Sequence, residues 1–229
     1  MLTRNTITCV LVAGLATSAA TAGGVGLNLW RANITALNGS GVSGTAELFL
    51  DGDNLTVTVV ATGLEADMAH PMHIHGLVDD MDGSSGDSTT PTIGADTDGD
   101  GFVELAEGLP SYGPVILPLT SPPGSGLDGF PTAPGGVINF SQVYDLSDDS
   151  VFGDGFDSDN LFPLDFREIV IHGMTVPAGI GAGTDGEVDG TGGYLATLPV
   201  AAGEFVLVPA PGVVTIAGLG GALAFRRRR

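Results

Sequence analysis

The stretch TAELFLDGDNLTVTVVA, residues 45–61, contains two apolar runs separated by a turn. The runs cover residues 45–50 and 55–61, and they flank Asp51-Gly52-Asp53-Asn54, a sequence typical of a hairpin turn. In the second run Leu55, Val57 and Val59 alternate with threonines, so one face of the strand is apolar. The stretch therefore predicts an antiparallel hairpin with one face turned toward a core.

Further short strands are predicted on both sides of this hairpin. They cover residues 27–37, 70–78, 115–119, 137–146, 166–172 and 194–200. The 37 glycines and 14 prolines favour many turns, and no helical periodicity of useful length appears between the two ends of the chain. We therefore expect an all-β fold, an antiparallel Greek-key β-sandwich over residues 23–205 with a long loop insertion near residues 79–135.

The N-terminal segment has the features of a secretory signal peptide. Arg4 precedes an apolar run over residues 7–15, and Ala20-Thr21-Ala22 forms a small-x-small cleavage site. We expect a signal helix that is removed after residue 22. The single cysteine, Cys9, lies inside it, so the mature chain has no disulfide.

The C-terminal segment has no charge from residue 205 to residue 225 and ends in Arg226–Arg229. About 20 apolar residues can span a bilayer, and the arginines would stay cytoplasmic. The Pro-rich break at residues 208–211, the short apolar helix and the arginine tail resemble a PEP-CTERM sorting signal of Gram-negative bacteria, although the glutamate typical of its core motif is missing.

That resemblance implies a processing protease as a partner and release of the domain after cleavage. The alternative for residues 206–229 is a plain transmembrane helix that anchors the domain to the membrane. Both interpretations predict an exported protein of the cell envelope or cell surface.

The predicted domain is strongly acidic. All 27 acidic residues lie in the predicted domain, residues 23–205, whereas its only basic residues are Arg31 and Arg167, which gives a net charge of −25. Such a field repels phosphate, so nucleic acid and anionic lipid surfaces are excluded as partners. Cations are the expected partners, and solubility in a salty habitat is the alternative explanation.

Residues 96–107, DTDGDGFVELAE, match the twelve-residue calcium loop at each diagnostic position. Gly101 permits the sharp turn. The expected Ca²⁺ ligands are Asp96, Asp98, Asp100, the carbonyl of Phe102, Glu104 directly or through water, and Glu107. Glycines and a proline in residues 82–95 exclude an entering helix. We therefore expect a structural calcium clasp in the insertion, and a self-repelling acidic turn is the alternative.

Three of the four histidines lie in His70-Pro-Met-His73-Ile-His75-Gly76. Residues i and i+2 of a strand share a face, so His73 and His75 project together. Imidazole is a common ligand of copper and zinc, which makes the pair half of a metal site. The fourth histidine, His172, follows the apolar run 169–171. Hydrogen-bonded packing at a sandwich edge is the alternative role.

These histidine strands resemble those of copper/zinc superoxide dismutases, and residues 44–76 resemble a CHRD domain, a related sandwich of exported bacterial proteins. The resemblance implies that His73, His75 and His172 are copper ligands and that His70 supports the site by hydrogen bonding. The chain departs from the dismutase pattern, because no histidine lies between residues 76 and 171 and Tyr194 stands where an anion-guiding arginine is expected.

We therefore expect an exported, envelope-anchored binding module, stabilised by calcium, with a candidate copper or zinc site and no assigned catalytic residue. A copper-dependent, superoxide dismutase-like redox enzyme is one alternative. A purely adhesive module without a transition metal is the other. The sequence does not identify a protein or glycan partner.

Overall fold

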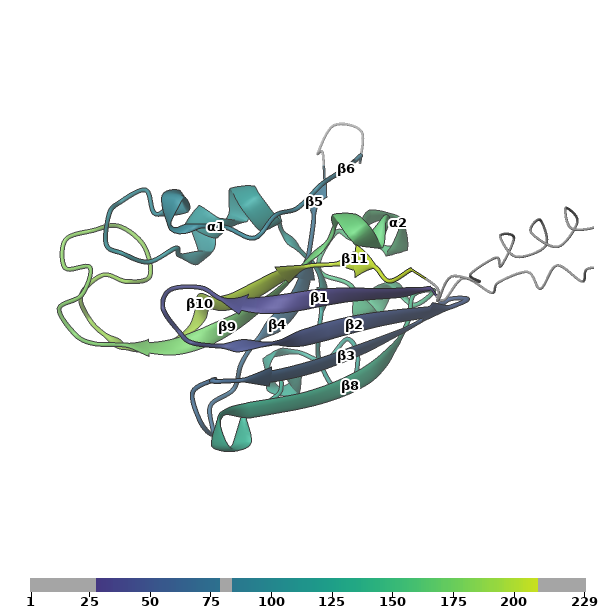
Figure 1. Cartoon of the computed structure of the whole chain (residues 1–229), viewed down its shortest axis with the longest axis horizontal. Helices are drawn as coiled ribbons and strands as arrows, with labels where there is room; N and C mark the ends of the chain where they lie inside the picture. The colour runs from purple at the N-terminus through teal and green to yellow at the C-terminus, as the bar shows by residue number, and fades with distance from the viewer. Residues whose placement is uncertain (1–27, 79–83, 210–229) are drawn as a thin grey trace, which may run out of the picture.

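Eight strands pair side by side in one curled antiparallel sheet in the computed structural model, which describes residues 28–78 and 84–209 (Figure 1). The order along the sheet is β7-β4-β9-β10-β1-β2-β3-β8. These strands are β1 (Leu29–Ala36), β2 (Ser43–Asp51), β3 (Asn54–Thr62), β4 (Met72–His75), β7 (Val115–Pro118), β8 (Val137–Asp145), β9 (Glu168–Val176) and β10 (Gly193–Glu204). The predicted all-β, sandwich-like fold is confirmed, and the strand order contains the crossovers expected of such a fold.

The remaining elements are short. β5 (Leu77–Val78) pairs with β6 (Ser85–Gly86), and β11 (Val206–Leu207) pairs with the start of β1. The helices are α1 (Leu105–Tyr112) and α2 (Ser158–Leu161), and the 3-10 turns are η1 (Ile93–Ala95), η2 (Leu127–Gly129), η3 (Pro134–Gly136), η4 (Asp149–Val151) and η5 (Leu164–Phe166).

The hairpin predicted from residues 45–61 forms with a two-residue turn, because Asp51 pairs with Asn54. Leu48 pairs with Val57, and both side chains are fully buried. Gly52 adopts a φ of 60°, a left-handed conformation that glycine reaches without a steric penalty. The alternation read from the sequence therefore sets the inner face of β2 and β3.

The main core lies between the two halves of the curled sheet. The inner faces of β2, β3 and β8 pack against Met72 and Ile74 of β4 and against Ile169 and Ile171 of β9. β1 joins the halves, since its first six residues pair with β2 whereas Thr35 and Ala36 pair with β10.

β4 and β9 are buried on both faces. Their inner face lies in the main core, and their outer face carries His73, His75 and His172 in alternation with the core residues. Tyr112 and Val170 belong to a second, smaller buried cluster on that outer face. Figure 1 shows α1 on the far side of β9 and β10 from β3 and β8. The insertion therefore covers the histidine face.

The prediction that no helix forms between the two ends of the chain is wrong at α1. Glu104 and Glu107 form a capping box, in which each side chain accepts a hydrogen bond from the other residue's backbone. Gly108 gives the Tyr112 ring room, because a Cβ at this position would lie 2.4 Å from it. The sequence of α1 does not predict a helix, because it contains Gly108 and Pro110, and both residue types have low helix propensity.

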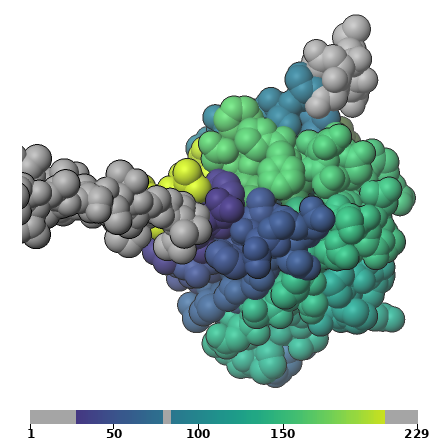
Figure 2. Space-filling model, turned by 90° about the vertical axis from the view of Figure 1, so that its right-hand side faces the viewer, coloured from purple at the N-terminus to yellow at the C-terminus, as the bar shows by residue number. Residues whose placement is uncertain are grey.

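The first and last described strands lie side by side. The amide of Val208 donates to the carbonyl of Leu29 over 2.8 Å, and Figure 2 shows the two ends of the described chain adjacent on one face. Strand pairing thus continues to residue 207, two residues past the expected domain end at residue 205.

The predicted signal helix and all but the first residues of the predicted C-terminal helix lie outside the described residues. Among the described residues, no helix is long and apolar enough to cross a membrane.

The hairpin provides a matched pair of positions for testing the core. Val59 is fully buried, whereas its neighbour Val60 is 43% exposed. We expect Val59→Ala to lower the free energy of unfolding by about 2 kcal/mol, because it removes two buried methyl groups and leaves a cavity. Val60→Ala should change it by less than about 0.5 kcal/mol. Urea denaturation measures both values, and equal effects would contradict the assigned faces.

Candidate metal centre

His73 and His75 of β4 and His172 of β9 converge on the outer face of the sheet. One ring nitrogen from each lies within 4.8 Å of one ring nitrogen of the others. The ring centroids are 5.4 Å apart for His73 and His75, 5.2 Å for His73 and His172, and 5.9 Å for His75 and His172. His75 and His172 are buried, and His73 is half-buried. The three histidines form a cluster that can hold a metal ion.

Backbone carbonyl groups orient two of the rings. His75 Nδ1 lies 2.8 Å from the carbonyl oxygen of Gly113, and His172 Nδ1 lies 2.6 Å from that of Thr197. A carbonyl oxygen only accepts, so each Nδ1 donates its proton and each Nε2 keeps a free lone pair. This is the arrangement in which protein histidines bind metals.

The nitrogens that remain are buried and have no partner. They are Nε2 of His75, Nε2 of His172 and Nδ1 of His73. A buried polar atom without a hydrogen bond is costly, and a cation bound to three such lone pairs would satisfy all of them at once. The donor set therefore fits a metal ion better than it fits packing histidines.

Burial keeps the three imidazoles neutral. Desolvation, followed by the effect of His172, lowers the pKa of His75 to about 3, and desolvation lowers the pKa of His172 to about 4. The pKa of His73 is also well below its usual value, because of burial and then the neighbouring His172 and His75. Neutral imidazole is the form that ligates metals, so no proton has to leave these rings at neutral pH.

His70 lies beside the cluster and not in it. Its Nδ1 is 2.9 Å from the carbonyl oxygen of His172, and its Nε2 is 3.0 Å from that of Glu65. The contact with His172 connects the segment before β4 to β9 at one of the three candidate metal ligands. They are the backbone contacts expected of a supporting histidine.

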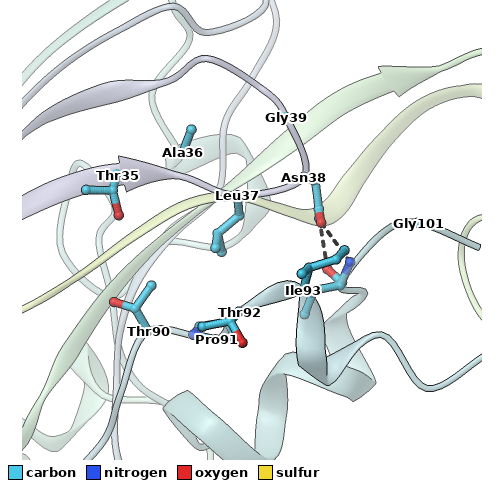
Figure 3. Close-up of a pocket in the computed structure, with 11 residues that line it drawn as sticks. Thr35, Ala36, Leu37, Asn38, Gly39, Thr90, Pro91, Thr92, Ile93 and Gly101 are labelled. Carbon is cyan, nitrogen blue, oxygen red and sulfur yellow. Dashed lines mark hydrogen bonds between the residues drawn. The ribbon is translucent and has the colours of Figure 1, made fainter. Parts of the chain in front are cut away.

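Two cavities bear on the location of the site. A cavity of about 230 Å³ borders His73 and His172. A larger one of about 580 Å³ lies between the end of β1 and the loop that leads to η1 (Figure 3). The larger cavity is lined by threonines, apolar residues and Asn38, which bonds to the backbone of Val103, and by no histidine or charged side chain. The smaller cavity is therefore the relevant one for chemistry at the histidines.

The predicted calcium loop gathers part of its expected ligands. Asp96, Asp98 and Glu107 each offer an oxygen within 4.8 Å of the others, and Gly101 has the expected positive φ of 95°. Oδ2 of Asp98 and Oδ2 of Asp100 are buried without partners. Desolvation raises the pKa of Asp100, and the neighbouring carboxylates add to the rise.

The side chains of the two glutamates of the loop accept hydrogen bonds. Oε1 of Glu104 accepts from the amide of Val188 over 2.5 Å, so this side chain connects the loop to residues 186–188. Oε1 of Glu107 accepts from the amide and the hydroxyl of Thr97, and Oε2 accepts from the amide of Glu104. In this arrangement Glu107 caps α1, and one of its oxygens also lies within 4.8 Å of an oxygen of Asp96 and of Asp98.

Sequence reasoning missed three side chains around the histidines. The Tyr112 ring lies 4.7 Å from that of His75, and the Phe130 ring lies 5.1 Å from that of His73. Glu168 is the cross-strand neighbour of His75, and its pKa is raised to about 8, chiefly by burial. Tyr112 and Phe130 come from the insertion, where no local pattern relates them to β4.

A comparison with protein-family models found no match to the chain, and neither did a comparison with curated protein sequences. The geometry of the described residues therefore carries the functional argument.

The low pKa values predict a pH dependence of the metal-free protein. Unfolded His75 takes up a proton near pH 6.5, whereas folded His75 does so only near pH 3. Its contribution to stability is therefore complete above pH 6.5 and is lost progressively as the pH falls toward 3.

Between about pH 7 and about pH 5 we expect His75 to account for a loss of about 2 kcal/mol. Urea denaturation of the original protein and of His75→Gln at both pH values measures the difference, in which the opposite contribution of Glu168 cancels. The same pH dependence in both proteins would contradict a neutral, desolvated His75.

Proposed function

We propose that this chain is an exported metal-binding module in which His73, His75 and His172 hold one copper or zinc ion. The observation that carries the proposal is the convergence of three buried, unpartnered ring nitrogens. The resemblance of the two histidine strands to those of superoxide dismutases and CHRD domains supports the same assignment.

The donor set favours copper or zinc over harder cations. Three neutral imidazoles suit copper and zinc, whereas magnesium and calcium prefer oxygen ligands. Gly113 and Thr197 supply the outer hydrogen bonds that such histidines usually have. When bound, a copper ion would supply one-electron chemistry, and a zinc ion would supply charge without redox chemistry.

Binding or structural work is favoured over superoxide dismutation. Apart from His70, which contacts backbone carbonyl groups, the chain has no further histidine for a second metal. Tyr194, at the position of the anion-guiding arginine in the resembled family, donates its hydroxyl to the carbonyl of Ala69. The cavity beside His73 and His172 leaves one side of the cluster accessible. That observation keeps a copper-dependent redox enzyme as the second candidate.

A calcium ion in the 96–107 loop is the second part of the proposal. The partnerless oxygens of Asp98 and Asp100 and the raised pKa of Asp100 support it, because a cation would stabilise these carboxylates. The role would be structural, since Glu104 links this loop to residues 186–188.

We also propose that the domain works in the cell envelope, attached through its C-terminal segment or released by a sorting protease. The signal-like start, the apolar segment and the terminal arginines support this location. Leu29 and Val208, near the two ends of the described chain, are hydrogen-bonded to each other. The N-terminal export signal and the C-terminal attachment would therefore join the domain at the same end.

We expect the purified protein to bind one equivalent of copper or zinc and His75→Gln to weaken binding at least about 100-fold, because only two ring nitrogens remain. Tyr112→Phe is the matched control, since it keeps the ring against His75 and removes no nitrogen. Metal analysis after dialysis and the EPR spectrum of the copper form measure the outcome. Equal copper binding by His75→Gln would exclude the three-histidine site.

Calcium should raise the melting temperature, because a ligand that binds only the folded state stabilises it. Asp98→Ala should remove most of that increase, because it deletes the ligand oxygen expected at the third position of the loop. Asp154→Ala, which alters an exposed aspartate in another acidic loop, is the control and should keep it. Identical melting in calcium and in chelator would refute the calcium clasp.

A further inference from the structure

The cavity beside the histidines has apolar walls. Its volume is about 230 Å³, and His73 and His172 form one side of it. Its other lining residues are Thr197 and six apolar residues, namely Pro71, Leu105, Val115, Leu127, Phe130 and Ala196. No charged side chain lines it. Although the domain has a net charge of −25, the cavity that borders the histidine cluster therefore has uncharged, mostly apolar walls.

Two side chains shape this cavity. The Phe130 ring packs edge-on against the His73 ring, with 5.1 Å between the centroids. Leu127, on η2, is 82% exposed, the highest exposure among the large apolar side chains of the described residues. A concave cavity with mostly apolar walls and a few polar groups is the usual form of a small-molecule site.

An anion would gain little in this cavity. It would lose hydration there, and no cationic side chain lines the wall to compensate. The only cationic side chains among the described residues are Arg31, which pairs with Glu47 at 2.5 Å, and Arg167, which is buried and donates to carbonyl oxygens. Neither lines the cavity. A bound metal ion would attract anions, so the preference has to be measured against a neutral ligand.

We propose that the accessible side of the histidine cluster binds a small uncharged molecule with an apolar body about the size of one aromatic ring. A cavity of about 150 Å³ lined by apolar side chains holds benzene, so this cavity has room for a single substituted ring. The metal-contacting part of the proposal rests on the proposed function. The apolar part rests on the cavity walls alone.

Fluorobenzene tests the apolar walls in the metal-free protein. We expect saturable broadening of its ¹⁹F NMR signal, and binding about tenfold weaker in Leu127→Arg, which replaces an apolar wall with a charge. Val143→Arg adds the same charge at an exposed position of β8 outside the cavity and should bind as the original protein does. No saturable binding to the original protein, or equal binding by Leu127→Arg, would overturn the proposal.

The copper-loaded protein tests the preference at the metal, with pyridine as the neutral ligand and azide as the anion. We expect pyridine to change the copper EPR spectrum at lower concentration than azide, and Leu127→Arg to shift the preference toward azide by about tenfold or more. A lower concentration requirement for azide in the original protein would overturn the proposal. Fluorobenzene binding without copper binding would refute the metal site and leave the apolar site standing.

Discussion

The antiparallel pairing of β4 with β9 is the constraint on which the rest of the site depends. Met72 pairs with Ile171 and His73 with Val170, and the amide of His172 donates to the carbonyl of Pro71 over 2.9 Å. This register puts Met72 and Ile171 into the main core and His73 on the opposite face together with Val170. A slip by one residue would exchange the two faces, burying imidazoles in the core. The core therefore enforces the geometry of the candidate metal centre.

The two proposed cation sites use opposite electrostatics. At the histidines, burial lowers the pKa values and produces neutral donors, so a metal would bring the only charge into an apolar surrounding. In the 96–107 loop the donors are carboxylates, and part of the pKa rise of Asp100 comes from Asp98, Asp96 and Glu107. The acidic surface can concentrate cations of any kind, but these local donor sets determine which cation each site prefers.

The sequence predicted what local patterns determine. Short apolar runs between turn residues located all eight strands of the main sheet, and alternation of apolar and polar residues identified the inner face of β3. The spacing of His73 and His75 placed them on one face, but the approach of His172 depended on a family resemblance. The carbonyl of Gly113 and the ring of Phe130 could not be predicted, since their contacts join segments far apart in the chain. α1 was missed because Gly108 and Pro110 interrupt its pattern.

α1 connects the two candidate sites. It begins inside the calcium loop, where Glu104 and Glu107 cap its first turn, and it ends at Tyr112, whose ring packs on His75. The next residue, Gly113, provides the carbonyl that orients the His75 ring. A helix of eight residues is too short to be stable alone, so its position depends on both of its ends. Any change that unfolds the loop would release the start of α1 and, through Gly113, the orientation of a candidate ligand. Calcium in the loop would thus act on the histidine site through the backbone, even though the two sites share no ligand.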